Sequence, residues 1–359
     1  MTKRLLLLNG LAALMVVLNH SASYGLNALF FWTNRYRDVR VPNFDQFGSV
    51  AYYILFTVHE IAEFAIPAFL FVSGFFIAFA ARTSAAGLKW EYIISRIKKL
   101  IPPFILWSVI LIILLRNFPP TFRQVMTVYY YIPLIIQYYL LSPFLVPLAK
   151  NHWKGLLIVT GCIQLGLESL RLLALLGVDI PGLQLIIGLT PIYFFPGRIF
   201  YFSIGLVAGL HVQGFTQWIK QARWFLLGGA IVFLILSIIE YEFLAELLQK
   251  PWLVPYYSGV LKALYAVGLT LSILAFDQVR LPFTAQISDI GSKSLGIYFV
   301  NTPALYVAGT LIYYFTPAFL GMPVLYQAIL ISFGYGVPLL LMAIFAKTPA
   351  RKVYHFVFG

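Results

Sequence analysis

The sequence predicts an all-α integral membrane protein, a bundle of about ten transmembrane helices. Of its 359 residues, 61% are hydrophobic and only 10% are charged, and the mean hydropathy is +0.88. A soluble domain carries about 25% charged residues, so this chain lacks the composition of a water-exposed surface. The apolar runs are about 20 residues long and do not alternate with polar residues, which is typical of helices that cross a bilayer.

Ten apolar segments satisfy the length requirement. The first begins directly after Lys3 and Arg4 and is not followed by a small-x-small cleavage site, so we interpret it as a retained span rather than a signal peptide. The second and ninth are long enough to be tilted, kinked at Pro67 or Pro303, or broken. The expected spans cover residues 5–25, 50–80, 101–118, 126–148, 155–177, 190–212, 223–245, 255–276, 287–314 and 323–346.

The net charge of +13 fits a membrane protein better than a nucleic-acid-binding protein, because basic residues gather in the cytoplasmic loops of membrane proteins. With the N-terminus inside, basic residues outside the spans favour the cytoplasmic side by about two to one. An even number of spans then places both termini in the cytoplasm. We therefore expect a multipass protein of the inner (plasma) membrane that contacts the lipid bilayer and no nucleic acid.

His20 is the most informative residue, because it lies deep in the first apolar run. A titratable side chain inside lipid is costly and usually faces a polar cavity. Asn9, another strongly polar residue of this run, precedes His20 by nearly three helical turns. Asn9, Ala13, Val16 and His20 thus share one stripe, roughly 16 Å long, which predicts a groove between the two membrane faces. His20 is suited to act as a general base; the alternative is a hydrogen bond to a neighbouring helix.

A second polar group comprises His59, Glu60 and Glu63 in the second span. His59 and Glu63 are four residues apart, so they share a helix face and can pair. A carboxylate beside a histidine orients the ring and stabilises its charged form. Glu63 could serve His59 or, across helices, His20, whereas the alternative places both acids in water at the outer interface. We expect Glu63 rather than Glu60 to have the buried role.

Arg96 and Lys99 are three residues apart, on one face of a helix that enters the membrane from the cytoplasmic side. Two such cations can bind a phosphorylated ligand. Anchoring to anionic lipid is the more general explanation of such a pair. Pro102 and Pro103 follow directly and fix how the helix enters the membrane.

Other polar residues lie within or beside apolar runs. Gln137 and Asn301 are amides in the middle of spans and need partners. Arg198 lies close to a span, where pairing with another helix or snorkelling is usual, and Ser73 permits close helix approach. The largest outer loop, residues 24–49, mixes aromatic and polar side chains, which suits a sugar as well as an interfacial aromatic belt.

The sequence lacks motifs for a metal or a nucleotide. Its histidines are too scattered to predict a metal site, and it contains no P-loop, GxSxG, HExxH or dinucleotide-binding fingerprint. Cys162 is the only cysteine and lies in an apolar run, so we expect a buried structural thiol without a disulfide.

Taken together, the motifs resemble the acyltransferase 3 family of multipass membrane acyltransferases over most of the chain. The run from Leu8 to His20 resembles the opening helix of that family, whose last residue is a histidine regarded as catalytic. Residues 67–75 resemble its FxxSGF segment, and residues 96–103 resemble its RxxR-x-x-PP segment, which is associated with acyl-CoA. The blocks at residues 131–143 and 294–303 also fit in order and spacing.

Three positions depart from the family pattern. The arginine expected eleven residues before the catalytic histidine is Asn9, the second arginine of RxxR is Lys99, and the histidine of the late Y-L-x-H motif is Asn301. Lys99 keeps the positive charge but loses the bidentate fork of a guanidinium group. Arg4 or Lys3 could supply the charge that Asn9 lacks near the inner face.

The resemblance implies a single transmembrane acyltransferase domain over residues 1–359. It implies transfer of an acetyl or similar group from cytoplasmic acyl-CoA to a hydroxyl group of a carbohydrate, in an exopolysaccharide or cell-envelope glycan. On this hypothesis His20 and Glu63 are catalytic, acyl-CoA is a co-substrate, and no permanently bound cofactor or metal is needed. The predicted substrate-binding residues are Asn9, Arg96, Lys99, Ser73, Gln137, Tyr131, Arg198 and Asn301.

Two routes and two other functions stay open at this point. The hydroxyl group could attack the thioester directly, or the acyl group could pass through an acyl-histidine. The chain could instead be a transporter or flippase for a lipid-linked sugar, since buried polar residues mark transport pathways too. The lack of an internal repeat of two halves argues against a transporter. A non-catalytic relative of the family is the third reading.

Overall fold

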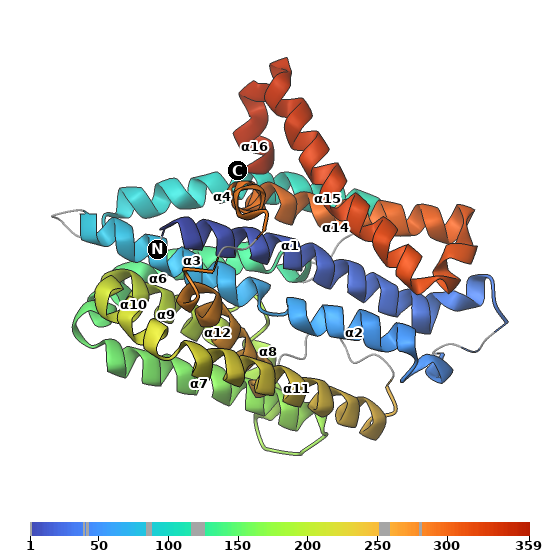
Figure 1. Cartoon of the computed structure of the whole chain (residues 1–359), viewed down its shortest axis with the longest axis horizontal. Coiled ribbons are helices and arrows are strands. Elements are labelled where there is room, and N and C mark those ends of the chain that lie inside the picture. The colour runs from blue at the N-terminus through green and yellow to red at the C-terminus, as the bar shows by residue number, and fades with distance from the viewer. Residues whose placement is uncertain are drawn as a thin grey trace.

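The computed structural model describes residues 2–38, 40, 43–83, 88–115, 126–250, 259–279 and 282–359. Within these residues every regular element is helical, and most of the long helices run along the long axis of the molecule (Figure 1). The α-helices are α1 (Thr2–Asn27), α2 (Val50–Ala62), α3 (Ala65–Thr83), α4 (Trp90–Leu115), α6 (Tyr131–Asn151), α7 (Trp153–Leu175), α8 (Leu183–Leu189), α9 (Ile199–Leu210), α10 (Val212–Gln221), α11 (Arg223–Leu247), α12 (Val260–Ala275), α13 (Thr284–Ser292), α14 (Ser294–Phe315), α15 (Pro323–Lys347) and α16 (Tyr354–Phe358).

The predicted all-α membrane bundle is confirmed. Eight helical segments of the described residues are long and apolar enough to cross a membrane, with α2 and α3 counted as one. The other seven are α1 together with its continuation to Trp32, α4, α6, α7, α11, α14 and α15. The pair α9 and α10 forms a ninth if it is counted as one span, although the two helices are bent by 111°.

Several predicted spans differ from the helices that form. Residues 50–80 are divided by a turn at Glu63 and Phe64. Pro67 lies in the first turn of α3, where N–H groups have no partner within the helix, so it starts the helix without kinking it. The predicted ninth span is two helices, because Lys293 separates α13 from α14, and Pro303 lies inside α14.

Three further boundaries also differ. The predicted span 190–212 contains an irregular segment before α9, and α12 has only 16 residues, fewer than a full span needs. Residues 255–258 and 116–118 of two predicted spans lie outside the described residues. Helix α4 begins at Trp90, eleven residues before the predicted 101, because hydropathy marks only the apolar part of a helix whose first turns are basic.

Cys162 is exposed on α7, so the prediction of a buried thiol is wrong. An apolar run in a membrane helix can face lipid as well as protein, and the sequence does not separate the two environments.

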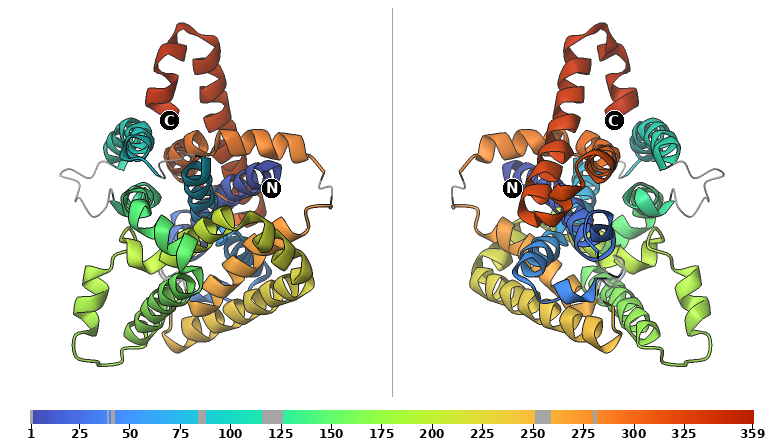
Figure 2. Two further views of the ribbon diagram at one scale, coloured as in Figure 1. Left: turned by 90° about the vertical axis from the view of Figure 1, so that its left-hand side faces the viewer. Right: turned by 90° about the vertical axis from the view of Figure 1, so that its right-hand side faces the viewer.

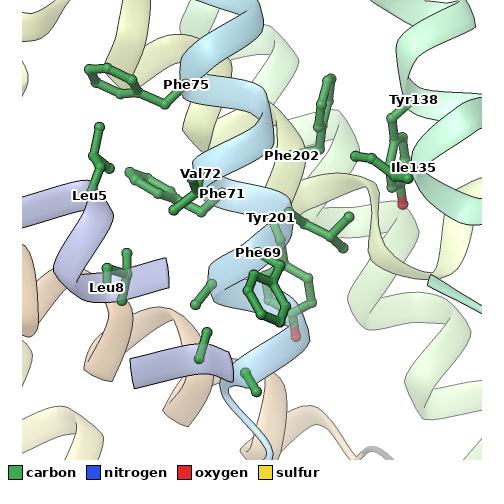
Figure 3. Close-up of a cluster of buried hydrophobic side chains, with 14 of the residues drawn as sticks. Leu5, Leu8, Phe69, Phe71, Val72, Phe75, Ile135, Tyr138, Tyr201 and Phe202 are labelled. Carbon is green, nitrogen blue, oxygen red and sulfur yellow. The ribbon is translucent and has the colours of Figure 1, made fainter. Parts of the chain in front are cut away.

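Helix α3 lies in the centre of the bundle and packs most extensively against α9. Two glycines permit this approach: a Cβ atom at Gly205 would lie 2.1 Å from the Phe71 carbonyl oxygen, and one at Gly74 would lie 2.3 Å from that of Phe202. Side chains of α1 and α6 fill the space on either side of this pair (Figure 3). The ring of Tyr138 stacks on that of Phe202, with centroids 5.0 Å apart.

Helix α1 is enclosed by α2, α3, α13, α14 and α15. Helix α13 crosses the bundle axis close to the start of α1 (Figure 2). Gly10 permits the contact between the two helices, because a Cβ atom at this position would lie 1.9 Å from the Ile287 carbonyl oxygen. Because α1 is surrounded by protein, the polar side chains along it face other helices. The packing therefore places the stripe from Asn9 to His20 inside the molecule.

Candidate active site

A cavity of about 230 Å³ lies beside the C-terminal half of α1. Residues of α1, of the turn between α2 and α3, of α14 and of the chain that leads into α6 and α9 line it. Three of the residues predicted to be functional, His20, Glu63 and Arg198, are among them. We call this space the histidine cavity.

His20 is held by Asn301, which lies on α14. The Nδ1 atom of His20 is 2.7 Å from Oδ1 of Asn301. The Nδ2 atom of Asn301 donates to the carbonyl oxygens of Ile297 and Tyr298, at 2.8 and 2.7 Å, which turns the amide oxygen toward the imidazole. An amide oxygen can only accept, so Nδ1 of the neutral ring carries the hydrogen and Nε2 carries the lone pair. This tautomer is the one in which Nε2 can act as a base.

Glu63 contacts the residue beside His20. Its Oε1 atom accepts from Nδ2 of Asn19 at 3.3 Å and lies 3.6 Å from Nε2 of His59. The pairing of His59 with Glu63, predicted from their spacing, is thus present. Glu63 contributes a carboxylate to the wall of the histidine cavity, whereas Asn301 is the group that orients the His20 ring.

Glu60 is the fully buried acid, and Glu63 is partly exposed. The prediction that Glu63 rather than Glu60 has the buried role is therefore wrong. The Oε1 atom of Glu60 lies 2.7 Å from Nζ of Lys262 and 3.3 Å from Nδ1 of His59. The side chain of Glu60 is 0% exposed and that of Lys262 is 4% exposed. A buried carboxylate needs a cation nearby, and Lys262 on α12 provides it. The sequence around Glu60 does not show that Lys262, about 200 residues later, packs against it.

Arg198 reaches the histidine cavity from the short 3-10 turn that precedes α9. Its guanidinium group lies over the ring of Tyr130, 5.4 Å from the centroid. This places a cation in the same cavity as His20 and Glu63. Such a cation can stabilise negative charge on a reacting oxygen.

The irregular segment before Arg198 is bonded by side chains of α6 and α7. Gln137 donates from Nε2 to the Tyr193 carbonyl at 2.7 Å and accepts at Oε1 from the Phe195 amide at 3.2 Å. Arg171 donates to the Thr190 carbonyl at 2.8 Å. Gln137, predicted to bind substrate, belongs to neither described cavity lining and supports the segment that carries Arg198.

A second cavity, of about 350 Å³, lies toward the N-terminal end of α1. Five predicted substrate-binding residues line it, from four helices: Asn9 (α1), Ser73 (α3), Arg96 and Lys99 (α4), and Tyr131 (α6). The hydroxyl groups of Ser73 and Tyr131 are 3.3 Å apart and form a hydrogen bond. We call this space the basic cavity.

Arg96 and Asn9 are positioned by different kinds of contact. The guanidinium group of Arg96 donates from Nε and Nη2 to the Tyr92 hydroxyl at 3.1 and 2.8 Å, which uses two of its five donors. Asn9 donates from Nδ2 to the Gly291 carbonyl at 2.7 Å and to Oγ of Ser294 at 2.9 Å. Asn9 therefore joins α1 to the junction of α13 and α14, at the position where the family pattern has an arginine.

The two ends of the predicted stripe lie in the two cavities, Asn9 in the basic cavity and His20 in the histidine cavity. The predicted continuous groove is divided, because Tyr298 borders both spaces. Sequence reasoning did not single out Asn19, Tyr130 or Tyr298. Asn19 could have been found as a second amide in the first span, whereas the two tyrosines are indistinguishable in sequence from interfacial ones.

Within the described residues, no group of three or more His, Cys, Asp or Glu side chains could hold a metal ion.

Comparison with known proteins gives one match. A family model described as an acyltransferase domain matches residues 4–343, nearly the whole chain. This confirms the resemblance to the acyltransferase 3 family that the motifs indicated. No curated protein and no solved structure matches the chain.

The buried pair of Glu60 and Lys262 gives a test of stability. Replacing Lys262→Met should destabilise the protein by roughly 3–5 kcal/mol, because it leaves a buried carboxylate without its cation. The double variant Glu60→Gln/Lys262→Met should recover most of this loss. Thermal unfolding in detergent measures both effects.

The exposed pair of Lys293 and Asp289, with Nζ and Oδ2 2.6 Å apart, is the matched control. Lys293→Met should cost no more than about 1 kcal/mol, since water already solvates both groups. Equal losses for Lys262→Met and Lys293→Met would show that burial of the Glu60 pair carries no energetic weight.

Proposed function

The chain belongs to the acyltransferase 3 family, and from this premise we propose that it is a membrane O-acyltransferase for carbohydrate. It moves an acetyl or similar group from cytoplasmic acyl-CoA to a hydroxyl group of an exopolysaccharide or cell-envelope glycan. The observation that supports this most directly is the bond between His20 and Asn301, which leaves Nε2 of His20 as a base on an internal cavity. Sugar hydroxyl groups need such a base to become nucleophiles.

The basic cavity suits the donor. Arg96 and Lys99 provide two positive charges for the phosphates of acyl-CoA, and charged hydrogen bonds to phosphate are strong. Asn9, Ser73 and Tyr131 provide polar atoms along the path from these cations toward His20. Acyl-CoA is then a co-substrate that leaves as free CoA, and the proposal includes no permanently bound cofactor.

The proposed reaction follows from the position of Nε2 of His20, the ring nitrogen that does not contact Asn301. Nε2 of His20 takes the proton of the acceptor hydroxyl, and the oxygen attacks the thioester carbonyl carbon. The carbon–sulfur bond breaks, and the departing thiolate takes the proton from the imidazolium, which Asn301 and Glu63 stabilise. Arg198 offsets the negative charge on the carbonyl oxygen during the transfer. In the alternative route Nε2 itself takes the acyl group and then passes it to the hydroxyl.

The proposed orientation of the protein in the membrane follows from the side on which the donor is found. Acyl-CoA is cytoplasmic, and the basic cavity lies toward the N-terminal end of α1, so this end belongs on the inner side of the inner membrane. On this proposal the C-terminal half of α1, which carries His20, lies nearer the outer side. A glycan acceptor reaches the histidine cavity from there.

His20 should be indispensable to turnover. His20→Ala should lower transfer by about 10²–10⁴-fold, the contribution of a general base. His20→Gln should fail equally, because an amide can bond Asn301 but cannot take a proton. The measurement is incorporation of radiolabelled acetyl-CoA into the glycan fraction of membranes that carry the protein, together with release of free CoA.

His211→Gln is the matched control, since Nε2 of His211 contacts the Ala149 carbonyl at 3.0 Å and His211 borders neither described cavity. This variant should transfer at the parental rate. A near-parental rate for His20→Gln would remove His20 as the base. Glycan movement without release of CoA would support the transporter instead.

The donor site should depend on both cations. Arg96→Ala or Lys99→Ala should raise the KM for acetyl-CoA by about tenfold or more, since a charged hydrogen bond contributes roughly 1.5–3 kcal/mol. Lys98→Ala is the control, because Lys98 is exposed on the same turn and lies outside the described lining of the basic cavity. An unchanged KM in the double variant would contradict the donor site.

Sidedness can be tested with single cysteines in a Cys162→Ser background. Asp38→Cys and Lys89→Cys lie at exposed positions in the segments that follow α1 and precede α4. A membrane-impermeant maleimide applied from outside should label position 38, and position 89 should react only from the inside. The reverse pattern would overturn the proposed orientation.

A further inference from the structure

The two cavities are stacked along the same helices. On α1 the lining changes from Asn9 in the basic cavity to Val16 in the histidine cavity, and on α14 it changes from Leu295 to Thr302. Tyr298, between Leu295 and Thr302, is the one described residue that borders both spaces. The cavities therefore meet at the side chain of Tyr298.

Tyr298 is bonded to the chain that leads into α6, which also borders both cavities. The Tyr298 hydroxyl accepts a hydrogen bond from the backbone amide of Tyr131 at 3.3 Å. The Tyr131 residue borders the basic cavity, whereas the preceding Tyr130 borders the histidine cavity. The phenol of Tyr298 and the chain at residues 130–131 thus form part of the boundary between the two cavities.

Neighbouring rings hold Tyr298 in place. Its ring makes edge-to-face contacts with Tyr129, Tyr131 and Phe299, at centroid distances of 6.0, 5.6 and 5.6 Å. The side chain is 5% exposed. Its carbonyl oxygen accepts from Asn301, which holds His20, so movement of α14 at this point would also disturb the base. Both the ring and the backbone of Tyr298 are therefore held by neighbouring groups.

We propose that Tyr298 limits the length of the acyl group that can pass from the basic cavity to the histidine cavity. The inference rests on the proposed function, because with the phosphates at Arg96 and Lys99 and the base at His20, the thioester has to pass Tyr298. A two-carbon acyl group disturbs this packing least, because each further methylene group has to displace packed aromatic rings, and a close-packed interior resists this.

The test uses a reporter cysteine that detects passage without requiring turnover. Val16→Cys, in a Cys162→Ser background, places a thiol in the histidine cavity close to this boundary. The probes are bromoacetyl-CoA and 2-bromohexanoyl-CoA. The cysteine thiolate attacks the carbon that bears bromine, a carbon–sulfur bond forms, and bromide leaves. Mass spectrometry of the peptide measures the rate, and excess free CoA should suppress labelling that starts from the basic cavity.

Tyr298→Ala should accelerate labelling by 2-bromohexanoyl-CoA by at least about tenfold, because the packing barrier to the longer chain is removed. Labelling by bromoacetyl-CoA should change much less, and Tyr298→Phe should keep the parental selectivity, since the ring remains. Tyr298→Leu, which retains apolar packing, repeats the comparison if the Ala variant does not fold. Tyr265→Leu removes a buried ring on α12 that borders neither described cavity and is not one of the three rings packed on Tyr298, so it should leave the selectivity unchanged.

Equal acceleration of both reagents, no acceleration, or the same effect from Tyr265→Leu would overturn the role of Tyr298. The proposed function is judged separately. If Arg96→Ala/Lys99→Ala leaves CoA-sensitive labelling intact while Tyr298→Ala still changes the selectivity, the donor site is wrong and the role of Tyr298 stands.

Discussion

A polar group enclosed in this apolar bundle has to find its partner within the protein, because lipid offers none, and the site is built from the partners that result. Asn301 satisfies its Nδ2 with two carbonyl groups of its own helix, which leaves only its oxygen for His20. Glu60, fully buried, has Lys262 at 2.7 Å and His59 at 3.3 Å as its partners. The requirement for internal partners thus fixes the tautomer of His20, through Asn301, and the pairing of the buried charges of Glu60 and Lys262.

The same constraint explains the irregular chain before α9. Non-helical backbone exposes N–H and C=O groups, and these are tolerated in a membrane protein only where other parts of the protein bond them. Gln137 bonds both the Tyr193 carbonyl and the Phe195 amide, and Tyr138 donates to the Phe195 carbonyl at 2.6 Å. The break in the helix brings Arg198 to the histidine cavity, where a continuous helix would have carried the chain past it.

The two cavities lie along the same closely packed helices. Gly74 and Gly205 let α3 and α9 approach closely, and Gly10 lets α13 press on the start of α1. Beside α1 lie two cavities, one bordered by Asn9 and the other by residues from Val16 to Tyr24. A basic space and a histidine-lined space thus lie in series, and the proposed transfer from a phosphorylated donor to a hydroxyl acceptor uses them in that order.

The sequence by itself determined the features that depend on local periodicity and composition. Long apolar runs predicted the helical membrane class, the spacing of His59 and Glu63 predicted their pairing, and the stripe from Asn9 to His20 predicted that both residues face the interior. The ordered motifs also indicated the family. The pairing and the stripe concern residues within a few turns of one another, where the geometry of a helix is known in advance; the family depends on the order of motifs along the chain.

Only the tertiary structure decided which distant groups meet. It paired His20 with Asn301, 281 residues away, and Glu60 with Lys262, 202 residues away. It also broke the second span at Glu63, bent α9 from α10, and placed Tyr298 between the two cavities. The physical reason is that hydropathy shows how apolar a helix is but not which neighbour each face meets, and that choice is made by the packing of all the helices together.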